Sequence, residues 1–172
     1  MERAKNRDND AFPLGMVLRG RPDAAARLSG SQDYPGIRGE VQFYQTRRGL
    51  LVRAEFWGLP RAEAPCKERI FGFHIHEGGS CAGDWANPFA GAGGHYNPRG
   101  CPHPSHAGDL PPLFGNDGRA LAVFLTDRFT VREILGKTLI VHDRPDDFTS
   151  QPAGNAGTRI ACGVIEPTGR GF

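Results

Sequence analysis

Residues 37–44 read IRGEVQFY, and residues 52–57 read VRAEFW. In both stretches apolar side chains alternate with polar or charged ones, so that Ile37, Val41 and Phe43 share one face. A period of two is typical of strands with one buried face. The pair Arg48-Gly49 lies between the two stretches and is typical of a hairpin turn. We therefore expect a β-hairpin in the first third of the chain.

Four further runs have strand character. They are rich in β-branched and aromatic residues, they are bounded by Gly or Pro, and they span residues 71–76, 120–126, 138–142 and 159–165. No segment carries a helical stripe over three turns, and residues 130–135 make one helical turn at most. Residues 78–112 and 143–157 resist strand assignment, and long loops in a compact domain are usually functional or disordered. Short strands with frequent turns predict an all-β sandwich or barrel.

Length and charge restrict the classes of protein. The chain has 172 residues, about one domain, and 21 basic against 19 acidic side chains. A net charge of +2 argues against nucleic acid held by a basic face. No run of 18 apolar residues exists, so we expect no membrane span. Residues 1–22 are polar and unpatterned, and we expect a flexible N-terminal arm before a domain at 23–172.

The compartment is left open by the sequence. The first residues carry charges but no apolar core of a secretory leader. This favours a cytoplasmic protein, and the alternative is an exported, periplasmic or extracellular protein whose leader has been trimmed. The chain holds four cysteines, an even count that permits one or two disulfides.

All six histidines lie between residues 74 and 142, and the first 73 residues have none. His74 and His76 are two apart in a strand-like run, so both imidazoles point to the same side. Such a pair could reach one metal ion, and imidazole suits zinc, copper, iron and nickel. The alternative is a pair of solvated strand histidines.

The other histidines extend this metal interpretation. His95 follows two glycines, which permit a close approach of the backbone. His103, His106 and Asp109 recur at steps of three in a loop stiffened by proline. Imidazoles with one carboxylate are a usual ligand set for tetrahedral Zn²⁺, whereas the alternative is a polar surface turn. His142 ends an apolar strand, and with five other histidines we interpret it as a ligand as well.

Five motifs occur in order along the last hundred residues. They are GFHIHEGGSC at 72–81, GGHYNP at 93–98, HAGDLP at 106–111, LIVHDRPDD at 139–147 and GNAGTRIACGVI at 154–165. With these motifs the chain resembles copper/zinc superoxide dismutases, and the short gap between His76 and Cys81 resembles the bacterial branch. The resemblance implies a Greek-key β-sandwich or flattened barrel with long metal-binding loops. It also implies an enzyme that converts superoxide to O₂ and hydrogen peroxide by Cu(II)/Cu(I) cycling, with a structural zinc.

The resemblance further implies a role for each matching residue. The implied copper ligands are His74, His76, His95 and His142. The implied zinc ligands are His95, His103, His106 and Asp109, so that His95 bridges both metals and takes up a proton during catalysis. Asp146 would hydrogen-bond His74 and His103, Cys81 and Cys162 would form a disulfide, and Arg159 would attract superoxide beside copper. The sequence leaves the oligomeric state open, with a homodimer as one candidate, because dimer surfaces vary within this family.

Other features fit the family pattern less closely. Only two residues separate His103 from His106, and residues 148–158 carry no charge, so steering of the anion would rest mostly on Arg159. Cys66 and Cys101 match no family position. A second disulfide between them is the favoured interpretation, and the alternatives are two free thiols or Cys101 as a zinc ligand.

Two functions of other classes compete with the enzyme. One is a copper-binding or copper-delivery module on the same fold, which would be expected to lack Arg159 or a copper ligand. The other is a structural sandwich with vestigial metal sites. The complete ligand sets favour the enzyme over both.

Overall fold

The computed structural model describes residues 12–62, 64 and 69–169. These residues form a seven-stranded antiparallel sheet in the order β5-β8-β9-β1-β2-β3-β7 and a two-stranded sheet of β4 and β6. The strands are β1 (Ala24–Gly30), β2 (Arg38–Thr46), β3 (Gly49–Trp57), β4 (Ile70–Phe71), β5 (Phe73–His76), β6 (Leu113–Phe114), β7 (Arg119–Thr126), β8 (Thr138–His142) and β9 (Arg159–Pro167). The helices are α1 (Leu14–Arg19), α2 (Val131–Ile134) and the single 3₁₀ turn η1 (Ala90–Ala92).

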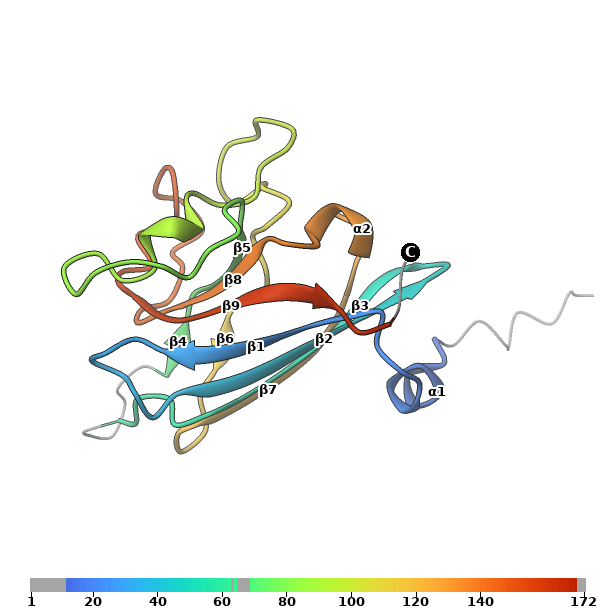
Figure 1. Ribbon diagram of the computed structural model, residues 1–172, viewed down its shortest axis with the longest axis horizontal. Coiled ribbons are helices and arrows are strands. Elements are labelled where there is room, and N and C mark those ends of the chain that lie inside the picture. Colours follow the sequence, from blue (N-terminus) through green and yellow to red (C-terminus); the bar gives the residue numbers. More distant parts are fainter. Residues whose placement is uncertain (1–11, 63, 65–68, 170–172) are drawn as a thin grey trace, which may run out of the picture.

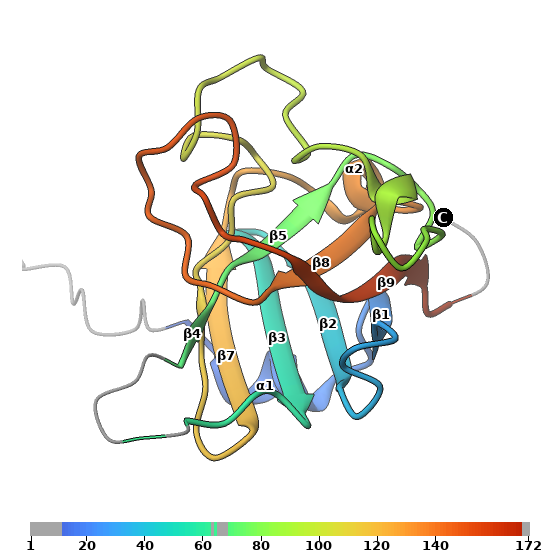
Figure 2. The same ribbon diagram turned by 90° about the vertical axis from the view of Figure 1, so that its left-hand side faces the viewer.

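The large sheet curls into a half-barrel, so the all-β prediction is confirmed. Figure 1 shows β5, β8 and β9 above β1, β2, β3 and β7, and in Figure 2 the two groups run obliquely to each other. The core lies between these two layers and contains the inward side chains of both. Phe56 of β3 and Phe73 of β5 meet edge to face there, with ring centroids 5.8 Å apart.

The predicted hairpin is formed by β2 and β3. Val41 pairs with Ala54 and Phe43 with Val52, and all four side chains are buried as the alternation predicts. The turn ends at Gly49, whose φ of +123° lies in the region that favours glycine. A Cβ atom there would also come within 2.6 Å of the Thr126 carbonyl oxygen. The turn therefore requires glycine both for its backbone angle and for its contact with β7.

The single run expected at residues 71–76 is in fact two strands that meet at Gly72. The Gly72 N–H donates to Arg144 O at 2.7 Å, and its carbonyl accepts from the His142 N–H at 2.8 Å. A Cβ at Gly72 would lie 2.8 Å from Cβ of Ala156. The chain therefore changes pairing partners at Gly72, which brings the loop after β8 against the start of β5.

Several elements were not predicted. The strand β1 reads AAARLSG, and alanine gives little of the β-branched signal by which strands are recognised. Within the predicted arm at 1–22, residues 1–11 lie outside the described part, whereas Leu14–Arg19 form α1.

The predicted helical turn at 130–135 is confirmed as α2, which begins with a capping box between Thr130 and Glu133. No helix of the described part is long and apolar enough to cross a membrane.

Two long loops lie on the same side of the half-barrel, which is at the top of Figure 2. Residues 77–112 follow β5 and residues 143–158 follow β8, and neither loop contains a named strand. Because β5 and β8 pair antiparallel, the two loops start at opposite ends of this strand pair, and the first loop returns along β5, where His95 bridges to His76 and Asp109 to His74. The two loops enclose the region in which the histidines gather.

Candidate metal centre

Strand pairing and isolated β-bridges determine where the histidines lie. His74 and His76 lie on β5, and His142 ends β8, where a register irregularity follows Val141. Isolated bridges set His95 beside His76 and Asp109 beside His74. Strand pairing therefore brings residues that are far apart in the sequence to one place.

The first cluster contains four histidines. Its ligand atoms all lie within 4.8 Å of one another, and its members are His74, His76, His95 and His142. The Nε2 atoms of His76 and His142 are 3.4 Å apart. His74 and His76 are 0% and 1% exposed, which excludes the solvated strand pair as an interpretation.

The second cluster is centred on Asp109. Its members are His95, His103, His106 and Asp109, again within 4.8 Å and all buried. Asp109 Oδ1 lies 2.7 Å from His95 Nδ1 and 3.3 Å from His106 Nδ1, and Oδ2 lies 3.1 Å from His103 Nδ1. His95 belongs to both clusters, so its ring lies between them.

The unpaired nitrogens of these rings test whether the residues fit metal ions. Four buried ring nitrogens of the described chain make no hydrogen bond, namely His74 Nδ1, His95 Nε2, His103 Nδ1 and His106 Nδ1. Burying a polar nitrogen without a partner costs free energy. A metal ion at each cluster would satisfy these atoms, so the donor sets fit two cations.

Backbone carbonyls bond the second ring nitrogen of two histidines in the first cluster. The Nδ1 atoms of His76 and His142 bond the carbonyls of Gly93 (2.9 Å) and Gly157 (3.2 Å). Such partners fix the ring orientation and make metal ligands more basic. The sequence motifs did not identify these carbonyls, because a backbone oxygen leaves no residue-type signal.

Asp146 connects the two clusters from outside. Its Oδ2 lies 2.8 Å from His74 Nε2, and its Oδ1 lies 2.8 Å from His103 Nε2. Burial by itself raises the pKa of this carboxyl, but hydrogen bonds from His74, the Phe148 N–H and His103 outweigh burial and lower the pKa to about 2. A Cβ at Gly154 would collide with Asp146 Oδ1, so glycine is required where the loop closes over this carboxylate.

Burial keeps three rings of the first cluster neutral in the absence of a metal. Desolvation lowers the pKa of His74, lowers that of His76 to about 2 and lowers that of His142 to about 3. Imidazole binds a metal in its neutral form. These rings are therefore ready to act as ligands at neutral pH.

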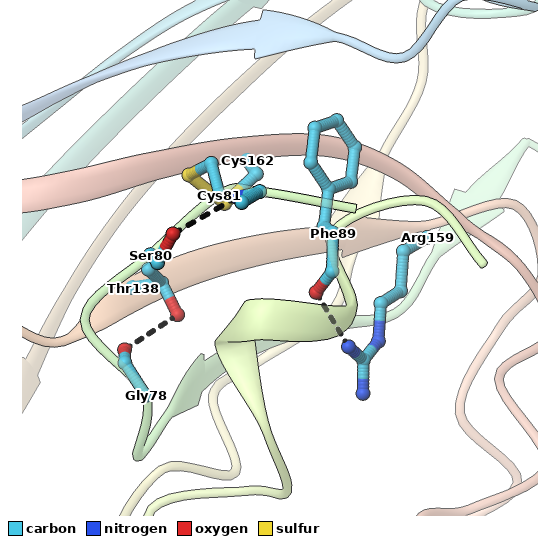
Figure 3. Close-up of a disulfide and its surroundings, with 8 residues drawn as sticks. Gly78, Ser80, Cys81, Phe89, Thr138, Arg159 and Cys162 are labelled. Atoms are coloured by element: carbon cyan, nitrogen blue, oxygen red, sulfur yellow. Dashed lines mark hydrogen bonds between the residues drawn. A yellow bond between two sulfur atoms is a disulfide. The ribbon is translucent and has the colours of Figure 1, made fainter. Parts of the chain in front are cut away.

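Arg159 lies at the start of β9, next to the first cluster. Its Nη1 donates to Phe89 O at 2.7 Å (Figure 3), and its Nη2 donates to Gly93 O at 2.6 Å. The Gly93 carbonyl also holds His76, so one oxygen positions both the guanidinium and a candidate ligand. Burial lowers the pKa of Arg159 from its usual value, yet arginine stays charged in proteins.

Arg159 faces an open hollow at the surface. The hollow has a volume of about 580 Å³, and its polar lining includes Asp84, Asn87 and Thr158. Gly93 and Gly157, whose carbonyls hold two of the candidate ligands, line it as well. A small anion therefore has a path from solvent to the guanidinium.

A disulfide ties the first long loop to β9. Cys81 and Cys162 are bonded, as the family resemblance implied (Figure 3). Thr138 Oγ1 of β8 donates to Gly78 O at 3.0 Å in the same loop. The loop that carries the carbonyls bonded by Arg159 is therefore tied to both β8 and β9.

The remaining cysteines do not form part of this arrangement. Cys101 is a free cysteine whose backbone bonds the Asn97 side chain, and it belongs to neither histidine cluster. Its predicted partner Cys66 lies outside the described residues. The described residues thus support neither the second disulfide nor Cys101 as a zinc ligand.

Loss of the Cys81–Cys162 bridge should destabilise the protein strongly. The bridge spans 81 residues, and closing a loop of this length in the unfolded chain is worth about 4–5 kcal/mol in the chain-entropy treatment. The double variant Cys81→Ser, Cys162→Ser should lose that much unfolding free energy, as measured by urea titration of the metal-free protein. Cys101→Ser is the matched control and should leave the midpoint unchanged. A double variant as stable as the parent would contradict the expectation.

Comparison with known proteins assigns the family. The sequence model of the family described as copper/zinc superoxide dismutase matches residues 37–165. Copper–zinc superoxide dismutase 2 of Aquifex aeolicus is 38% identical over 144 residues, which cover 75% of this chain and 79% of that protein. The superoxide dismutase of Deinococcus radiodurans is 33% identical over 148 residues, with 76% and 78% covered. Extracellular superoxide dismutase of Rattus norvegicus is 34% identical over 179 residues, with 96% and 68% covered. This chain therefore belongs to the copper/zinc superoxide dismutase family.

Proposed function

We propose that this protein dismutes superoxide to O₂ and hydrogen peroxide at a centre of two metals that share His95. The observation that carries the proposal is the buried His95 ring, whose Nδ1 contacts Asp109 while its Nε2 is left without a partner beside three other histidines. Four imidazoles suit copper, which has the highest affinity of the divalent first-row metals. Three imidazoles with one carboxylate suit zinc. In this proposal copper binds the first cluster and zinc the second.

When bound, copper would supply one-electron chemistry between Cu(II) and Cu(I), and zinc would supply fixed positive charge. The reaction consumes two protons from solvent, and the protein passes on one of them and orients the rings. His95 holds and releases a proton at Nε2, while its Nδ1 stays beside Asp109. Asp146 keeps His74 and His103 in place on the two sides of the centre.

Arg159 binds the substrate in this proposal. Superoxide is a small anion, and the guanidinium, which lines the hollow, is held by two carbonyls. Charge-lined clefts, those of superoxide dismutases among them, raise the association rates of anions by about 10–10³. Asp84 is the acidic residue that lines the hollow, so its charge opposes entry of the anion.

A copper titration tests this function. Superoxide decay should accelerate in proportion to the copper bound and reach a plateau at one copper per chain, with zinc present throughout. Zinc alone should give no acceleration, because Zn²⁺ has no redox chemistry. Copper that binds with the same stoichiometry but leaves superoxide decay unchanged would reject the enzyme in favour of a copper-binding module.

The metal-free protein should lose stability as the pH falls from about 6.5. The folded-state pKa values of His76 and His142 are about 2 and about 3, whereas the ordinary value is 6.5. Between these values the unfolded chain binds protons that the folded chain excludes, so the stability decreases by up to about 1.4 kcal/mol per pH unit for each ring. Urea midpoints measured from pH 7 to pH 4.5 check this. A midpoint that stays constant over this range would contradict it.

We also infer that the protein works in an oxidising compartment. The Cys81–Cys162 disulfide supports this inference, because disulfides persist outside the reducing cytosol. Relatives from Rattus norvegicus and Drosophila melanogaster are named as extracellular proteins. Trapping of free thiols in the source cells tests the inference: the bridge should be oxidised there, and a reduced Cys81 in active protein would contradict it. A homodimer stays a prediction.

A further inference from the structure

The second cluster depends on a short segment that lies outside the named strands and is bonded to β5 only near its end, at Gly108 and Asp109. Residues 103–109, here called the ligand loop, carry three candidate ligands in seven positions. The ligands His103 and His106 are separated by only two residues. The backbone bonds within the loop include Asp109 N–H to His106 O, at a long 3.3 Å. The Ile75 N–H donates to Gly108 O, and the Gln151 side chain bonds the backbone of His103. Firm support for the carbonyls of Pro104, His106 and Asp109 therefore has to come from another segment.

Arg128 provides such support from the segment after β7. Its Nη1 donates to three carbonyl oxygens of the ligand loop: Asp109 O at 2.9 Å, His106 O at 3.2 Å and Pro104 O at 3.4 Å. Two of these carbonyls belong to candidate ligands themselves. Buried backbone carbonyls require a donor, and a charged donor gives a stronger hydrogen bond than a neutral one.

The segment that carries Arg128 is itself firmly anchored. The next residue, Phe129, is buried in the main core. The Arg128 N–H donates to Thr126 Oγ1 at 3.3 Å, and the capping box of α2 begins two residues later at Thr130. The backbone at Arg128 is thus anchored to the half-barrel, and its exposed side chain reaches across to the ligand loop.

We propose that Arg128 is a positioning residue that sets the zinc affinity of the ligand loop. By holding the carbonyls of His106 and Asp109, it fixes the peptide planes that follow these two ligands and so directs their side chains inward. The same contacts leave the first cluster untouched, because its members lie on other segments, except for the shared His95. The choice of zinc as the ion rests on the proposed function, whereas the clamp on the loop does not.

The expected effect is a selective loss of zinc. Removing a partner that orients metal ligands typically costs 10–100-fold in metal affinity. Because Arg128 acts through the backbone, we expect Arg128→Met to weaken zinc binding by about tenfold, which corresponds to about 1.4 kcal/mol. Methionine keeps the unbranched side chain while removing the charge and all five donors.

Zinc binding is measured by competition with a chromophoric chelator, and cobalt(II) replaces zinc in a parallel titration so that its visible spectrum reports the ligand geometry. Arg132→Met is the matched control, since Arg132 is exposed on α2 and makes no hydrogen bond or ion pair with the ligand loop among the described residues. Arg128→Lys tests rescue, because an ammonium group still donates to carbonyls. Copper affinity and urea unfolding of the metal-free protein are measured for every variant.

The proposal predicts weaker zinc binding and an altered cobalt spectrum in Arg128→Met, partial recovery in Arg128→Lys, and no change in Arg132→Met. Copper affinity and metal-free stability should match the parent protein. Unchanged zinc affinity in Arg128→Met would overturn the proposal, and so would an equal loss of copper affinity or of metal-free stability, which would indicate general damage to the fold. Superoxide decay by the fully loaded parent is assayed separately. Failure of the proposed function is therefore distinguishable from failure of the proposed role of Arg128.

Discussion

Arg159→Ala is expected to lower the rate constant of superoxide decay by about 10–10³-fold while the protein keeps its copper. The substitution removes the positive charge that lines the hollow. His76 keeps its bond to the Gly93 carbonyl, so the copper ligands stay in place. Pulse radiolysis gives the rate constant, and metal analysis of the same samples gives the copper content.

Arg159→Lys is the informative control for this variant. Lysine keeps the charge but cannot donate in the fork that reaches both Phe89 O and Gly93 O. We expect an intermediate rate for Arg159→Lys and a weaker dependence on ionic strength for Arg159→Ala than for the parent, because screening acts on the charge that has been removed. An alanine variant as fast as the parent at low salt would remove Arg159 from the mechanism.

Asp146→Ala should weaken the binding of both metals, by about 10–100-fold each, with the fold intact. The reason is the bridging geometry, in which one carboxylate holds His74 on the copper side and His103 on the zinc side. Without it, both rings lose the partner that fixes their orientation, and two buried Nε2 atoms lose their hydrogen bonds. Chelator competition for copper and for zinc checks the two affinities independently.

Asp127→Ala is the matched control for this experiment, since it removes an exposed aspartate from the loop after β7. It should leave both affinities unchanged. Loss of only one metal in Asp146→Ala would show that the carboxylate serves a single site, and loss of neither would reject its bridging role. Urea unfolding of the metal-free variant separates a metal effect from a folding defect.

The orientation of the two strand histidines among the proposed copper ligands could be predicted from the sequence. His74 and His76 are two apart in a strand, and strand geometry alone puts both rings on one side. The structure agrees, with Phe73 and Ile75 in the main core and the two histidines in the first cluster. Regular alternation is a local property, and it can be recognised without knowing which segments pair.

Contacts between distant segments could not be predicted in this way. The split of the expected strand at Gly72 depends on the loop after β8, which approaches Gly72 only in the folded chain. Arg128 follows β7 and has no motif around it, and its partners are carbonyl oxygens, which every residue carries. The family resemblance supplied the role of Asp146, because its two histidine partners are 72 and 43 residues away.

Anomalous X-ray diffraction from crystals loaded with both metals decides whether His95 binds both ions. Data collected at the copper and zinc absorption edges locate each ion separately. We predict a copper peak next to Nε2 of His95 and a zinc peak about 2.0–2.1 Å from Nδ1 of the same ring. A single metal peak, or a zinc peak away from His95 Nδ1, would contradict the shared centre.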